Sequence, residues 1–173
     1  RHDVCSKAAS NGHLHILQWA RSQDPPCHWN GDACEMSVSK GHIHIVKWLR
    51  EQNPPCPWGE DLCTIAAGKG NLEILQYLRS QNPPYPWSID QCAKIAASNG
   101  HLHLLKWMLS NTNQHKYFNK VCHLAAAGGQ LHIIKWARNE VNPKLPWDAE
   151  VCSMAAYRGH IDVIQWVRSQ DPP

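Results

Sequence analysis

The chain has little of what marks a membrane protein, a nucleic-acid binder or a nucleotide-dependent enzyme. No apolar run approaches the roughly 18 to 20 residues that a spanning helix needs. The net charge is only +3, and the basic residues are spread along the chain instead of forming one basic face. No G-x-x-x-x-G-K-[ST] loop is present to hold a phosphate. We therefore predict no membrane segment and no nucleic-acid partner.

The sequence contains six copies of one motif. Residues 8–21, Ala-Ala-Ser-Asn-Gly-His-Leu-His-Ile-Leu-Gln-Trp-Ala-Arg, recur with one glycine per copy at intervals of 29 or 30 residues. A period of about 20 to 50 residues held over many copies is typical of a solenoid, in which each unit buries its apolar face against its neighbours. The sequence predicts one array over 1–173, without an internal boundary, made of units at 1–29, 30–58, 59–87, 88–117, 118–147 and 148–173. The anchoring glycines are Gly12, Gly41, Gly70, Gly100, Gly129 and Gly159.

Each unit is predicted to be a helix-turn-helix, so that the fold class is all-α. A Trp precedes the residue expected to cap the first helix, and a cysteine follows four residues after that cap, as in a hydrophobic staple. Two small residues and the glycine then end the first helix. The second helix has an apolar arc wide enough to contact the units on both sides. The expected caps and their tryptophans are Trp29-Asn30, Trp58-Gly59, Trp87-Ser88 and Trp147-Asp148.

Most of the eight cysteines are predicted to be thiols in the core. One occupies the same place in every unit, and helices that pack about 8 to 10 Å apart hold such residues too far apart for disulfides between units. Cys27 and Cys56 are different because they lie in loops, where a bridge is possible but a free thiol is favoured. The pattern favours a reducing compartment, the cytoplasm or the nucleus. The repeated cysteines are Cys5, Cys34, Cys63, Cys92, Cys122 and Cys152.

The histidines do not predict a metal site. Pairs such as His13 and His15 are two residues apart, which places them on different sides of a helix, and histidines of successive units stand too far apart to share an ion. Those after the glycine, such as His42 and His160, are expected to hold the corner between the two helices. Those two residues later, such as His44, are expected to be solvated. No nucleophile and base recur outside these structural places, so no catalytic site and no cofactor are predicted.

Residues 8–17 resemble the ankyrin-repeat signature A-A-x-x-G-H-L-E-I-V, and the similarity recurs at 71–75 and 160–164. Two features differ. The T-P-L-H opening is replaced by residues 3–6, Asp-Val-Cys-Ser, and the units are about four residues shorter than the usual 33. The missing residues belong to the hairpin tip, so the β-hairpins are expected to be reduced or absent. The repeat sequence looks like a shortened ankyrin variant that is found in large arrays of giant DNA viruses and protists.

The resemblance implies a protein–protein interaction scaffold that binds a protein partner through its concave face and is not an enzyme. Two alternatives stay open: an architectural or spacer subunit of a larger assembly, and an adaptor that recruits substrates through a module elsewhere. The chain lacks an initiator Met and a signal peptide, and its last unit is as apolar as the inner ones. Because arrays usually end in units with a polar outer face, we expect it to be part of a longer array.

The candidate partner-binding residues are those that vary while their neighbours repeat. They lie just before each glycine or one step after each repeated cysteine, at positions predicted to be free from packing. Plain solvated surface is the alternative for each of them. The candidates are Ser10, Asn11, Glu35, Ser39, Lys40, Thr64, Lys69, Ser98, Asn99, His123, Tyr157 and Arg158.

Overall fold

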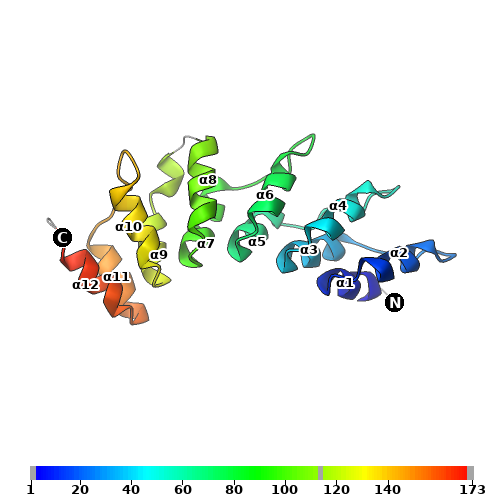
Figure 1. Ribbon diagram of the computed structural model, residues 1–173, viewed down its shortest axis with the longest axis horizontal. Helices are drawn as coiled ribbons and strands as arrows, with labels where there is room; N and C mark the ends of the chain where they lie inside the picture. The colour runs from blue at the N-terminus through cyan, green and yellow to red at the C-terminus, as the bar shows by residue number, and fades with distance from the viewer. Residues whose placement is uncertain (1–2, 113–114, 171–173) are drawn as a thin grey trace. The chain divides into compact units, whose positions relative to one another are not determined.

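The protein is all-α over the residues that the computed structural model describes, 3–112 and 115–170, and no β-strand occurs in them. None of the helices in these ranges has the length and apolar character that crossing a membrane requires. The helices pack as sequential pairs (Figure 1). They are α1 (Asp3–Ser10), α2 (Leu14–Ser22), α3 (Gly31–Lys40), α4 (Ile43–Glu51), α5 (Leu62–Lys69), α6 (Leu72–Arg79), α7 (Ile89–Ser98), α8 (Leu102–Thr112), the 3-10 helix η1 (His115–Phe118), α9 (Val121–Ala127), α10 (Leu131–Asn139), α11 (Ala149–Arg158) and α12 (Ile161–Arg168).

The chain divides into two compact units, Arg1–Trp87 and Ser88–Pro173. The boundary falls between the third and fourth predicted repeats, so each unit contains three helix pairs. In the first unit α1 packs on α3 and α3 on α5, and in the second α7 packs on α9 and α9 on α11. Packing between successive pairs is therefore seen inside each unit, whereas the single array over both remains a prediction.

A glycine in the left-handed conformation makes the corner of each pair. At Gly41, φ is 80° and the glycine N–H bonds to the carbonyl oxygens of Ser37 and Val38. The next N–H, that of His42, bonds to the Ser37 carbonyl at 2.9 Å. These bonds satisfy the last carbonyls of α3, and glycine adopts this φ without a Cβ penalty. All six predicted corner glycines have a positive φ, between 69° and 84°.

The second helix of a pair buries a broad apolar arc, as predicted. In α4 the side chains of Ile45, Val46 and Leu49 are fully buried, while His44 and Lys47 are exposed. A helix of this length is marginal in isolation, so its stability comes from this packing.

The predicted caps are confirmed at three of four positions. Asn30, Ser88 and Asp148 cap α3, α7 and α11, and each side chain accepts a hydrogen bond from an N–H of the first turn. The prediction of Gly59 as a cap is wrong, because α5 begins at Leu62. Gly59 has no side-chain acceptor, and the hydroxyl of Tyr85 instead donates to its carbonyl at 2.8 Å.

An arginine at the end of the second helix holds the loop that follows. Arg21 donates from Nη1 to the Cys27 carbonyl at 2.8 Å, and its guanidinium carbon lies 4.1 Å from the ring centre of Trp29. We call this combination the arginine clamp. A planar guanidinium can serve both a carbonyl and an aromatic face. The other clamps join Arg50 to Cys56 and Trp58, Arg79 to Tyr85 and Trp87, and Arg138 to Leu145 and Trp147.

The loop tryptophans are packed and not exposed, which agrees with the structural interpretation of them. Trp29 is 7% exposed, and its ring lies 5.9 Å from that of Trp48 on α4 in an edge-to-face arrangement. Trp147 lies at the same distance from Trp166 on α12. Trp29 and Trp147 are thus held between the arginine of one pair and the second helix of the next, whereas the Trp58 ring lies 5.6 Å from that of the loop residue Tyr85.

All eight cysteines are free thiols. Five of the six repeated cysteines are buried, and Cys152 is half-buried. The loop cysteines differ from each other, because Cys56 is fully buried and Cys27 is half-buried. The prediction of core thiols without disulfides therefore agrees with the structure.

Gly128→Ala tests the close packing of pairs in the second unit. Gly128 follows α9 with φ −89°, an ordinary value, but an added Cβ would lie 2.0 Å from the Ser98 carbonyl oxygen of α7. Because backbone would have to move, we expect a loss of about 3 kcal/mol or more in the free energy of unfolding, measured by urea denaturation.

The matched control is Gly159→Ala. Its added Cβ meets nothing within 4 Å, and only the positive φ of 79° opposes it, which costs about 1 kcal/mol. A loss in Gly128→Ala no larger than in this control contradicts the packing described for α7 and α9.

Candidate functional site

The varying residues before the glycines lie at the C-terminal ends of the first helices. Helices α1, α3, α5, α7 and α11 end at or next to these positions, and the glycine that follows turns the chain away. Tyr157 is strongly exposed, with 83% of its surface open to solvent. The serines Ser10, Ser39 and Ser98 are half-buried. The exposed candidates are Asn11, Lys40, Lys69, Asn99, Tyr157 and Arg158.

In the first unit, the polar side chain that follows the corner glycine hydrogen-bonds to the end of the first helix in the preceding pair. His42 hydrogen-bonds through Nε2 to the Ser10 carbonyl at 3.2 Å, and Asn71 donates from Nδ2 to the Val38 carbonyl at 3.0 Å. The ring of His42 also lies against Gly12, where an added Cβ would stand 3.1 Å from it. The end of α1 is therefore linked to that of α3, and the end of α3 to that of α5.

The second unit repeats this link. His160 hydrogen-bonds through Nε2 to the Ala127 carbonyl at 3.2 Å, and Gln130 donates to the Ser98 carbonyl at 3.5 Å. The histidines and Gln130 bond to the carbonyl two residues before the corner glycine of the preceding pair, and Asn71 bonds to the carbonyl three residues before it. The position therefore requires a polar side chain of suitable reach. The expected structural role of His42 and His160 agrees with these contacts, although neither caps its own helix.

The candidates one step after the repeated cysteine face the next pair. Glu35 and Thr64 are half-buried, and the Cβ of Glu35 stands 3.1 Å from the position of an added Cβ on Gly59. His123 is 5% exposed, so the prediction that it is free from packing is wrong. The residue after the repeated cysteine differs between repeats partly because the start of the first helix in the next repeat, which it faces, also differs.

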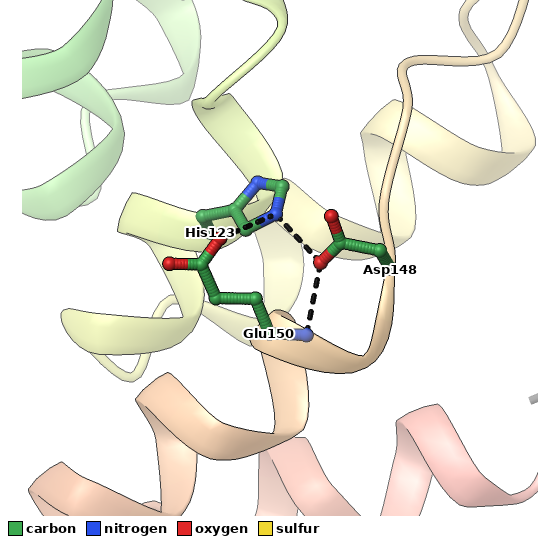
Figure 2. Close-up of side chains that lie close together, drawn as sticks. All are labelled: His123, Asp148 and Glu150. Atoms are coloured by element: carbon green, nitrogen blue, oxygen red, sulfur yellow. Dashed lines mark hydrogen bonds and ion pairs between the residues drawn. The ribbon is translucent and has the colours of Figure 1, made fainter.

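His123 lies beside two carboxylates at the start of α11 (Figure 2). Its Nε2 lies 2.9 Å from Oδ1 of Asp148 and 3.6 Å from Oε2 of Glu150. The same Asp148 oxygen accepts the Glu150 N–H at 2.9 Å. The hydrogen bond from His123 is the main cause that lowers the pKa of Asp148 below its usual value, and the Glu150 N–H adds to it.

The composition of this cluster fits a divalent cation, but its contacts fit a helix cap better. The three ligand atoms lie within 4.8 Å of one another. However, the Nε2 position is used by Asp148, and the ammonium of Lys120 lies 3.2 Å from Oε2 of Glu150. A neighbouring ammonium opposes a cation there. We therefore interpret the cluster as a link between α9 and α11.

The histidines of the second helices are solvated, as predicted. His15, His44, His103 and His132 are all exposed. His132 also bonds through Nε2 to the Gly100 carbonyl at 3.1 Å. Each is on its own helix pair, and they do not form the ligand cluster of a metal site.

An exposed apolar hollow in the first unit was missed by the sequence analysis. Its volume is about 660 Å³, and Trp19, Pro25, Pro26 and Cys27 line part of it. Trp19 is 63% exposed, whereas Trp48, at the same place in the next repeat, is half-buried against Trp29. Trp48 is covered by Trp29 from the preceding loop, and the sequence has no tryptophan before Trp19.

Neither a scan against protein-family models nor a search of curated proteins finds a match for this chain. Its interpretation therefore depends on the repeated sequence and on the contacts above.

Asp148→Asn tests the link between α9 and α11. The amide can still cap α11 as Asn30 caps α3, but it loses the carboxylate that His123 meets. Since the folded-state pKa of Asp148 is lowered, the carboxylate stabilises the fold above the ordinary aspartate pKa of about 4. This contribution is lost as the pH falls through the lowered folded value.

The measurement is the difference in unfolding free energy between the protein and Asp148→Asn over a series of pH values. We expect the protein to be the more stable at neutral pH and the difference to shrink below about pH 4. Glu150→Gln, which leaves the Asp148 cap in place, is the control. A difference that does not change with acidification rules out a role for the carboxylate charge.

Proposed function

We propose that the protein is a binding scaffold, in which the helix pairs form one ankyrin-like solenoid and the ends of the first helices bind a protein partner. The observation that carries this proposal is the distribution of variation. Most of the repeated apolar side chains are buried, as with Ala66 and Ala67, while six of the residues that differ between repeats at the helix ends, Lys40 and Tyr157 among them, are exposed. Side chains released from packing are free to carry specificity.

The hydrogen bonds between successive corners support one shared partner-binding surface and not a set of isolated binding positions. Since His42 and Asn71 tie successive helix ends together in the first unit, Asn11, Lys40 and Lys69 belong to neighbouring ends. A partner that spans them would contact several repeats, which is how repeat proteins gain area.

The charge of these positions favours an acidic partner segment. Lys40 and Lys69 are exposed in the first unit, and Arg158 is exposed in the second. Opposite charge at such a surface raises the rate of association and the specificity more than the affinity. The free thiols fit a reducing compartment, which we place in the cytoplasm or nucleus as part of the proposal.

One observation favours an architectural role as the second candidate. The large apolar side chains that are exposed among the described residues are Val4, Trp19, Tyr157 and Ile161. They lie on α1, α2, α11 and α12. A spacer in a larger assembly would use such faces to contact its neighbours.

The test combines co-purification with charge reversal. We expect a partner recovered with the protein to lose at least tenfold in affinity for the triple variant Lys40→Glu, Lys69→Glu, Arg158→Glu, since several charge contacts are reversed together. Binding is measured by titration calorimetry with the purified partner.

The control reverses Lys47 and Lys135, which are also exposed lysines but lie on second helices. If the partner binds at the ends of the first helices, this control variant keeps its affinity for the partner. Unchanged affinity in the triple variant, with loss in Trp19→Ser or Ile161→Ser, supports the architectural role instead.

A further inference from the structure

The first helix pair leaves exposed a face that is buried in other pairs. Val4 on α1 is 43% exposed. The side chains at the same distance from the corner glycine are fully buried in α3, α5, α9 and α11, which each pack against the first helix of a preceding pair in their own unit. These side chains are Ala33, Leu62, Val121 and Val151. Val4 therefore marks the face that a preceding pair would cover.

The last helix pair leaves the opposite face exposed. Ala156 on α11 is exposed. The side chains at the same distance from the corner glycine are fully buried in α1, α3, α7 and α9, which each pack against the first helix of a following pair in their own unit. These side chains are Ala9, Val38, Ala97 and Ala126. Ala156 therefore marks the face that a following pair would cover.

The second helices of the two pairs show the same asymmetry. Ile16 on α2 and Ile164 on α12 are both half-buried. Ile45 holds the place of Ile16 in α4 and is fully buried, and Ile134 holds the place of Ile164 in α10 and is fully buried. Each exposed face thus extends over both helices of its pair and is apolar.

The corner of the last pair is also uncovered. An added Cβ would lie 3.1 Å from the ring of His42 at Gly12, but it would meet nothing within 4 Å at Gly159. The first pair carries a side chain that can cover such a corner. His13 holds the place of His42 there, is exposed, and bonds to no helix end among the described residues.

We propose that the last pair of one copy of the protein packs against the first pair of a second copy, head to tail. The two exposed faces are the two halves of the contact that successive pairs make inside each unit, so each face finds its complement on another copy. The contact is heterologous, because two different surfaces meet. It goes beyond partner binding at the ends of the first helices and specifies the contact that an architectural subunit needs.

The internal contacts define the geometry of this interface. The face marked by Val4 on one copy covers the face marked by Ala156 on the other, which removes apolar surface from water. His42 bonds through Nε2 to the carbonyl two residues before the corner glycine of the preceding pair. By the same rule, Nε2 of His13 bonds to the Tyr157 carbonyl of the other copy.

The first measurement uses the unmutated full chain alone. Its average mass is followed by sedimentation equilibrium from micromolar to millimolar concentration. We expect the mass to rise with concentration above that of a single chain, since both faces are present on every copy. A mass equal to one chain at every concentration overturns the proposal.

Two single variants separate the two faces. Val4→Arg places a charge on the first face and Ala156→Arg places one on the second, and a charge is costly to bury in an apolar contact. Each variant alone keeps one working face, so we expect it to remain a single chain. An equimolar mixture should form complexes of one copy of each variant and nothing larger, because the two working faces meet and the two remaining faces are blocked.

Gln76→Arg is the matched control, because it adds the same charge at an exposed position of α6. We expect it to associate as the unmutated protein does. Association of either single variant with itself to the unmutated extent, or no complex in the mixture, overturns the proposal. The mass of the unmutated protein needs no variant, so a folding defect in one of them leaves the test intact.

The outcome is independent of the proposed partner surface. No partner is present in these measurements, so a failure here leaves binding at the ends of the first helices untouched. Val4 and Ala156 are also not among the residues reversed in the charge-reversal test, so a failure of that test leaves the head-to-tail contact untouched.

Discussion

Within each unit, the helices are stabilised by carbonyl bonds and apolar faces supplied by neighbouring pairs. The helices are 7 to 11 residues long, which is too short for stability in water without tertiary packing. The polar side chain after each glycine supplies one such bond, as between His42 and Ser10. The arginine clamp supplies another, because it fixes the loop that delivers the tryptophan to the following pair. Within each unit, these two kinds of contact recur between successive pairs.

This constancy separates structural residues from variable ones. The corner bond accepts histidine, asparagine or glutamine, and the loop position accepts cysteine, tyrosine or leucine, because the bonds that define both places involve backbone carbonyls. Variation at the ends of the first helices faces solvent and is available to a partner. Variation at the loop position remains inside the packing, since Cys56, Tyr85 and Leu145 are all buried.

The predictions succeeded where one local rule decides the structure. A positive φ at the corner requires glycine at Gly41, and Asn30 caps α3 because its side chain reaches the first turn. They failed where a residue about 25 positions away in the sequence intervenes. Gly59 does not begin a helix, since Tyr85 from the following loop bonds there. His123 is buried because the next helix start brings Asp148 against it.

The sequence by itself determined the helix pairs, their corners, the burial of the repeated apolar positions and the absence of strands from the described residues, because these follow from periodicity, glycine and caps within about thirty residues. Only the tertiary structure decided which equivalent side chains differ in their surroundings. Trp19 and Trp48 occupy the same place in their repeats and differ in exposure, and Cys27 and Cys56 occupy the same loop position but are half-buried and fully buried, respectively. Such contacts depend on what the neighbouring segment supplies, and a repeat read alone does not contain that information.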